Sequence, residues 1–380
     1  MKTLALPALL LAATACTLPP VETPDPTIDQ ALLARYRSAV PKKQNLSATL
    51  PESAGGAGAL VGDPAVYPAM AVPHVVGVNT MIGNILDTVE AVVALPPTLY
   101  NSETREFVWG PFDNGDSPLA GDKALVYIKE QDEGEDFQFV FAFARLMGDD
   151  IATAAPVIWG GVNPTPDVED QGNGVLLLDF EASRAFGEAN GADLSAEARG
   201  RFAAGFARGP NDDGSDSMVT LVVGSFRGFN GEGGTETIDV DHLWGNVAGA
   251  DGNTIDFMNL AVEGNVLQDT TAAETLDMQL VLWNRGIGRG EVLLTGGDAG
   301  ANIGEGTECW DAAVEQQYYQ VTVTDEAGAE TVVETEGDAA TGCPAPFDVP
   351  LADLGIPTLA DVDDGILGAL QNAAENGLGG

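Results

Sequence analysis

Two histidines are the side chains best suited to acid–base catalysis at neutral pH, and neither has catalytic neighbours in the sequence. His242 ends the run Asp239-Val-Asp241-His242. Side chains alternate along a strand, so we expect Asp241 and His242 on opposite faces, which is unsuitable for a Ser–His–Asp relay. The segment GSFRG (224–228) has its serine one place too early for a nucleophile elbow. The sequence also has no HExxH motif and no phosphate-binding loop, so we do not expect an enzyme.

Aspartate clusters are the candidate metal ligands. They are Asp212, Asp213 and Asp216, and a second group made by Asp361, Asp363 and Asp364. Neither has the spacing of an EF-hand loop, and no bidentate glutamate closes the first. Calcium is therefore kept as an alternative to a solvated turn or helix start, and no other cofactor is expected. Glycoside hydrolysis uses a pair of acids, but finding such a pair here does not indicate that activity, because 58 carboxylates always supply one.

The first sixteen residues predict export. A short basic start is followed by the apolar run 4–13, which is too short to span a bilayer and is typical of a signal peptide. The segment Ala13-Thr-Ala-Cys16 then resembles the lipobox of bacterial lipoproteins. This resemblance implies removal of residues 1–15 and lipid on Cys16. Ala13-x-Ala15 also fits an ordinary cleavage site, so a secreted or periplasmic protein without an anchor is the alternative.

The cysteine count supports this interpretation. Cys309 and Cys343 can pair in an oxidising compartment, which leaves Cys16 to the lipid. The two late cysteines flank a predicted hairpin, and with no CxxC spacing we expect a structural disulfide. Thr17 follows Cys16. An aspartate there resembles an inner-membrane retention signal in enteric bacteria, so its absence favours the outer membrane.

The charge balance excludes one class of partner. Asp and Glu number 58 against 16 Lys and Arg, for a net charge of −42. Such a chain is repelled by phosphate backbones, so we expect no nucleic-acid partner. Apolar residues make up 44%, which is enough for a buried core. The acidic excess is interpreted as a solubility coat, with calcium binding as the alternative.

Helical and irregular sequence precedes a long β region. Residues 16–27 form a Pro-rich tether and residues 28–100 a helical and irregular segment. In that segment, apolar residues from Val78 to Val93 predict an amphipathic helix that ends at Pro96-Pro97 and packs against the following sheet. A tail, 349–380, carries a predicted short helix over 358–376, with Gly377 after it.

Residues 101–348 show a period of two, typical of strands. About a dozen runs of this kind are separated by turn residues, without helices between them. We therefore predict a mainly β fold in which an antiparallel meander closes into a barrel or calyx, with a β-sandwich as the alternative.

The order of short motifs resembles a group of uncharacterised lipoproteins of myxobacteria and related marine proteobacteria. The motifs are the lipobox, the tether, ALPPT (94–98), VWGPF (108–112), TGGD (295–298), ECWD (308–311) and EGDAATGC (336–343). The resemblance implies placement and fold but no activity. We expect a lipid-anchored envelope protein with a non-enzymatic binding or structural domain and a small-molecule or lipid ligand. The alternatives are a secreted carboxylate-dependent hydrolase and a calcium-dependent surface or adhesion protein.

Overall fold

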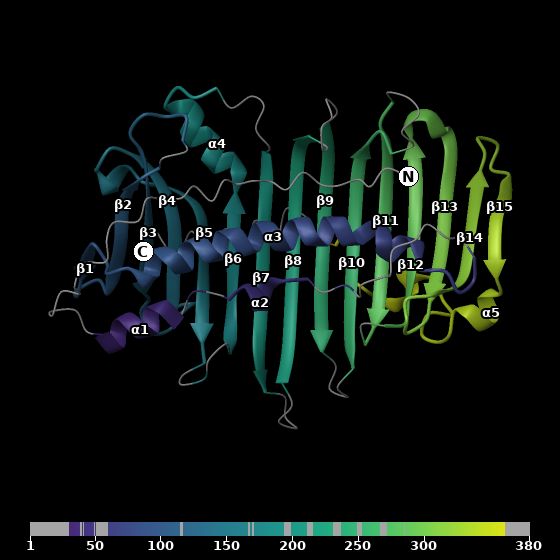
Figure 1. Ribbon diagram of the computed structural model, residues 1–380, viewed down its shortest axis with the longest axis horizontal. Helices are drawn as coiled ribbons and strands as arrows, with labels where there is room; N and C mark the ends of the chain where they lie inside the picture. The colour runs from purple at the N-terminus through teal and green to yellow at the C-terminus, as the bar shows by residue number, and fades with distance from the viewer. Residues whose placement is uncertain are drawn as a thin grey trace. The chain divides into compact units, whose positions relative to one another are not determined.

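The computed structural model contains one long antiparallel meander. It describes residues 30–361 except 39, 41, 49, 51–59, 115–116, 166–167, 169–170, 194–198, 211–215, 231–236, 249–252, 267–271 and 285. Fifteen strands follow each other in sequence order, β1 to β15, in a single sheet (Figure 1). The predicted mainly β fold and its meander are confirmed, but the expectation of no helix between the strands is wrong, because residues 180–189 form a helix between β6 and β7.

Closure of the meander into a barrel is not found. Over the described residues the strand order is linear, and it contains one sheet rather than the two that a sandwich needs. The period of two is the same in open and closed antiparallel sheets, so the sequence pattern carries no signal for closure.

The described chain divides into two compact units, which we call the N-unit (residues 30–47 and 79–220) and the C-unit (48–78 and 221–361). Helix α3 (Val66–Ala94) contributes residues to both. The other elements of the N-unit are α1 (Gln30–Ser38), α2 (Lys43–Leu46), β1 (Leu99–Asn101), β2 (Glu106–Asp113), β3 (Asp122–Glu130), β4 (Phe139–Met147), η1 (Ile151–Thr153), β5 (Ala155–Pro164), β6 (Gly172–Asp179), α4 (Phe180–Ala189) and β7 (Arg199–Pro210).

Strand β8 (Asp216–Asn230) begins in the N-unit and continues in the C-unit. The remaining elements of the C-unit are β9 (Thr237–Ala248), β10 (Thr254–Gly264), β11 (Glu274–Trp283), β12 (Gly288–Gly296), η2 (Gly297–Ala299), β13 (Gly300–Trp310), β14 (Gln316–Thr324), β15 (Glu330–Gly337), α5 (Ala339–Gly342) and η3 (Leu351–Leu354).

Tyr36 fixes α1 to the sheet of the N-unit. Its ring meets Phe107 and Phe139 edge-on, at centroid distances of 4.6 and 5.1 Å. Its hydroxyl donates to the carbonyl of Arg105 and accepts from the backbone N–H of Glu130. Burial raises the pKa of Tyr36. A buried aromatic ring with a satisfied hydroxyl therefore holds the helix in place.

Helix α3 begins twelve residues before the predicted start at Val78. The residues before Val78 belong to the segment 28–100, for which no helix was predicted directly ahead of Val78, and over 66–77 they are helical. Pro68 lies in the first turn, where its missing N–H costs nothing. The carboxylate of Glu308, on β13, accepts from the backbone N–H groups of Val66 and Tyr67, both at 2.8 Å. The helix start thus depends on a residue 242 positions away, which no local pattern reveals.

Charged side chains complement both ends of α3. The Glu308 carboxylate lies at the N-terminus, within the C-unit, and the Arg37 guanidinium lies at the C-terminus, within the N-unit. Arg37 donates to the carbonyls of Val93, Ala94 and Leu95. These signs match the helix dipole. By length and composition α3 could also cross a membrane. Many of its side chains are buried, as in a core helix. This agrees with the prediction of a helix that packs against the sheet.

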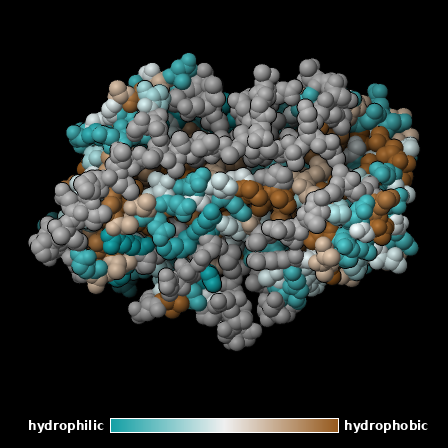
Figure 2. All heavy atoms as spheres, in the orientation of Figure 1, coloured by the Kyte–Doolittle hydropathy of each residue, from teal (hydrophilic) through white to brown (hydrophobic). Residues whose placement is uncertain are grey.

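Strand β15 is exposed along nearly its whole length. Val332 and Val333 are 48% and 57% exposed, and hydrophobic side chains gather over β14 and β15 at the right of Figure 2. Glu330, Glu334 and Glu336 lie on the same strand. Charges of one sign oppose pairing of the exposed strand with a second copy.

Candidate functional site

The predicted lipidation and calcium residues lie largely outside the described part of the chain. This holds for Cys16, Asp212 and Asp213, for Asp363 and Asp364, and for the side chain of Asp216 in β8. Asp361 is described, and its carboxylate accepts from the backbone N–H and the hydroxyl of Thr358, both at 2.9 Å. It therefore closes a turn with Thr358. No group of three or more metal-ligating side chains occurs among the described residues.

The two histidines are buried together in the C-unit. His74 on α3 and His242 on β9 are 7% and 1% exposed. Neither ring nitrogen of His242 has a hydrogen-bond partner in the described structure. On the other face of β9, Asp241 pairs with Arg227 at 2.8 Å, so it does not orient the imidazole. Burial lowers the pKa of His74 to about 4, and burial together with the charge of His74 lowers the pKa of His242 to about 3.

These histidines make the free energy of unfolding pH-dependent. Their folded pKa values lie below the unfolded value near 6.5, so the unfolded chain binds more protons and stability falls as the pH drops below about 6.5. At pH 5 each histidine costs about 2 kcal/mol relative to pH 7.5. Denaturant unfolding across this range should show a shallower fall for His242→Leu than for the wild type. An unchanged slope would contradict the burial of a neutral imidazole.

Protonation of Glu308 changes the free energy of unfolding in the opposite direction over part of that pH range. A histidine variant is therefore needed to isolate the contribution of the histidines. Burial raises the pKa of Glu308 to about 7, although the N–H groups of Tyr67 and Val66 lower it in part. A carboxyl group with a raised folded pKa favours the folded state at low pH. Glu308 is fully buried by the start of α3. Its role is to hold the helix, and it lies far from solvent.

A groove of about 620 Å³ lies in the C-unit between the sheet and the segment that follows the disulfide. Its floor comes from β10 to β14 and its roof from residues 350–360. The lining side chains are mainly polar. The floor comprises Asn259, Asp277, Gln279, Arg289, Glu291, Val292, Leu293, Glu305, Gly306, Thr307, Gln320 and Thr322, and the roof comprises Pro350, Ala352, Thr358, Leu359 and Ala360.

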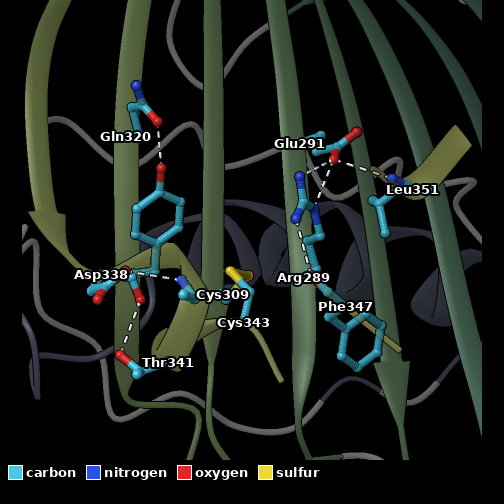
Figure 3. The surroundings of a disulfide bond; sticks show 11 residues. Arg289, Glu291, Cys309, Gln320, Asp338, Thr341, Cys343, Phe347 and Leu351 are labelled. Carbon is cyan, nitrogen blue, oxygen red and sulfur yellow. Dashed lines mark hydrogen bonds and ion pairs between the residues drawn. A yellow bond between two sulfur atoms is a disulfide. The ribbon is translucent and has the colours of Figure 1, made fainter. Parts of the chain in front are cut away.

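The roof is attached to the floor at several points. Cys309 and Cys343 are bonded, with their Cα atoms 5.4 Å apart, as predicted. Arg289 donates to the carbonyl of Phe347 at 3.0 Å, and the N–H of Leu351 donates to Glu291 at 3.1 Å (Figure 3). Because a covalent bond and backbone contacts hold this segment, the groove is a fixed feature of the C-unit.

Strand register arranges the floor in two rows. Asp277, Leu293, Glu305 and Thr322 are direct neighbours across β11 to β14. Asn259, Gln279, Glu291, Thr307 and Gln320 form the next row, from β10 to β14. Side chains of one row rise from the same face of the sheet. The floor is therefore a grid of carboxylate, amide and hydroxyl groups on rigid strands.

Several of these groups are already engaged. Arg289 pairs with Glu291 at 2.7 Å, and Asn259 donates to the carbonyl of Met278 and accepts from the N–H of Leu359. In the described structure Asp277 and Glu305 have no cationic partner, and Gln279, Thr307 and Thr322 have no hydrogen-bonded side-chain partner. Free donors and acceptors in a groove are what a polar ligand requires.

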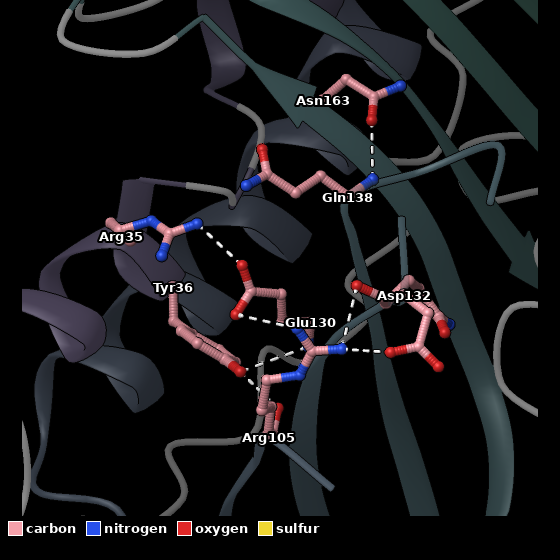
Figure 4. Close-up of polar contacts among 8 residues, drawn as sticks. Arg35, Tyr36, Arg105, Glu130, Asp132, Gln138 and Asn163 are labelled. Carbon is pink, nitrogen blue, oxygen red and sulfur yellow. Dashed lines mark hydrogen bonds and ion pairs between the residues drawn. The ribbon is translucent and has the colours of Figure 1, made fainter. Parts of the chain in front are cut away.

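The N-unit holds a second polar cluster, and it is structural. Arg35 and Arg105 both contact Glu130, at 2.7 and 3.9 Å, and Arg105 also reaches Asp132 (Figure 4). The hydroxyl of Tyr36 also bonds to the backbone of Arg105 and of Glu130. These contacts tie α1 to β3, and the cluster has a structural role.

Comparison of the chain with protein-family models, with curated proteins and with solved structures finds no match. The groove itself was not predicted from the sequence. Its residues come from five strands and a tail segment. In the sequence, the strand residues occupy the positions that face solvent in any strand of alternating polarity. The polar residues at every second position of β11 to β14 were the only signal, and ordinary surface strands give the same signal.

Proposed function

We propose that this chain is an exported cell-envelope lipoprotein, anchored through Cys16, whose C-unit binds a small polar ligand without converting it. The observation that carries the binding role is the groove with its free carboxylate, amide and hydroxyl groups. Support for the anchor comes from residues 1–16, and the disulfide agrees with an oxidising compartment. Placement in the outer membrane is part of this proposal and rests on Thr17.

A carboxylate-dependent hydrolase is the second candidate, because the groove contains Asp277 and Glu305 and burial raises the pKa of Asp277. Its geometry is less suitable. Both acids rise from the same face of one sheet, with Leu293 between them. Glycoside hydrolysis needs carboxyl groups that flank the scissile bond. Binding is therefore the better-supported function.

Thermal melting in the presence of small polar compounds tests the binding role. A panel of neutral sugars, amino acids and amines should include at least one compound that raises the melting temperature of the wild type, since a ligand stabilises the folded state that binds it. Thr307→Trp places a large ring in the groove and should abolish that shift. If no compound stabilises the wild type, or if Thr307→Trp responds equally, the groove is not the binding site.

The anchor is tested by Cys16→Ser. We expect the wild type in the membrane pellet and the variant in the soluble fraction, because acyl chains supply the attachment and the acidic body is repelled by anionic headgroups. The measurement is fractionation of host cells followed by mass determination of the mature N-terminus. An unmodified Cys16 thiol, or equal pelleting of both proteins, would contradict the lipoprotein proposal.

A further inference from the structure

The floor of the groove carries more negative charge than its own cations balance. Its ionisable groups are Asp277, Glu291, Glu305 and Arg289. Arg289 is already paired with Glu291. This leaves Asp277 and Glu305 without a cationic partner in the described structure, on strands β11 and β13. An uncompensated carboxylate inside a groove attracts a ligand cation more strongly than one on open surface does.

The two acids are separated by a single apolar residue. Asp277 and Glu305 both neighbour Leu293, on opposite sides, so their strands lie about 10 Å apart, which is two strand spacings. Thr322 is adjacent to Glu305, is only 7% exposed, and lines the groove with a hydroxyl that has no partner in the described structure. The hydroxyl oxygen is not sealed off from the groove, so it can hydrogen-bond to a ligand or to water. The row thus presents two charged ends and an apolar middle.

We propose that the groove binds an aliphatic diamine, or the diamine unit of a longer polyamine. One ammonium group pairs with Asp277, the hydrocarbon chain crosses Leu293, and the other ammonium group pairs with Glu305 and donates to Thr322. A chain of about three methylenes suits this span when about 2.8 Å is allowed for each ammonium–carboxylate contact. This inference rests on the proposed binding function and names its ligand class.

The environment of Asp277 agrees with a cationic ligand. Burial, and then the charge of Asp241 on β9, raises the pKa of Asp277. Asp241 itself is paired with Arg227. An added cation would stabilise the ionised form of Asp277, so binding should weaken as the pH falls toward the range in which Asp277 becomes protonated.

Calorimetric titration of the purified full chain tests the proposal, with 1,3-diaminopropane as the probe at about 0.15 M salt to screen the general negative field. We expect one saturable site. Propylamine, which has one ammonium group, should bind at least about tenfold more weakly, because one charge-assisted contact is lost. Shorter and longer diamines should also bind more weakly. This series uses only the wild type, so it does not depend on any variant folding.

Variants locate the site. Asp277→Asn and Glu305→Gln should each weaken diamine binding about tenfold or more, whereas Glu330→Gln on the exposed strand β15 should leave it unchanged. Equal affinity for monoamine and diamine, or an equal effect of Glu330→Gln, would show unspecific attraction to the acidic surface and overturn the proposal. If diamines fail but another compound stabilises the wild type and not Thr307→Trp, the groove binds a different ligand class and only this inference is lost.

Discussion

A variant that lacks the disulfide, Cys309→Ala/Cys343→Ala, is expected to unfold with a free energy about 4 kcal/mol below that of the parent. The bond closes a loop with a sequence separation of 34, and the estimate is the loss of chain entropy that this closure imposes on the unfolded state. Both cysteines are buried, so small apolar replacements leave no unpaired polar group. The fold should persist, because the strands of the C-unit keep their own core.

Equilibrium denaturation in a Cys16→Ser background measures this loss, since the two proteins then differ only at the bonded pair. A reducing agent should destabilise the parent by a similar amount and leave the variant unchanged. Peptide mapping without reduction should recover Cys309 and Cys343 in one linked peptide. Free thiols at both positions, or a loss smaller than about 1 kcal/mol, would contradict the stapling role.

The variant Arg145→Met is expected to destabilise the N-unit by about 3–5 kcal/mol, because it leaves a buried carboxylate without its cation. Arg145 pairs with Asp122 at 2.7 Å, and the Asp122 side chain is fully buried. Asn114 also donates to Asp122, but an amide does not supply charge. Arg145 further contacts α4, through the Ser183 carbonyl and hydroxyl and over the Phe186 ring.

A matched arginine provides the control. Arg184 pairs with Glu188 at 2.8 Å on the surface of α4, and Arg184→Met should cost less than about 1 kcal/mol. Adding Asp122→Asn to Arg145→Met should recover part of the lost stability by removing the unpaired charge. Denaturant unfolding of the four proteins completes the comparison. Equal effects of Arg145→Met and Arg184→Met would mean that the Asp122 pair is not buried in solution.

Local patterns predicted the elements that depend on neighbours in the sequence. The period of two gave the strands, and the positions of the two late cysteines around a hairpin gave the disulfide, which is confirmed. Pro96-Pro97 correctly ended α3. Each of these features is specified by alternation, by turn chemistry or by the absence of a backbone donor, and none requires knowledge of distant contacts.

Features that depend on distant residues were missed. The first turn of α3 depends on Glu308. Barrel closure depends on whether the two end strands pair, and the alternation of polar and apolar residues does not indicate this. The groove needs a roof, and the tail segment becomes one only because Cys343, Phe347 and Leu351 are held against β12 and β13. Separately, the predictions for Cys16, Asp212 and Asp213 lie outside the described residues and stay predictions.

Native mass spectrometry of the protein purified from its host tests the binding role of the groove most directly. The wild type should carry a small non-covalent ligand of defined mass, which collisional activation removes, and Thr307→Trp purified in parallel should lack it while melting as a folded protein. Lipid bound to Cys16 would be retained in both and is thereby distinguished from the groove ligand. A wild type with no added mass, or the same added mass on Thr307→Trp, would contradict a ligand-binding function for this groove.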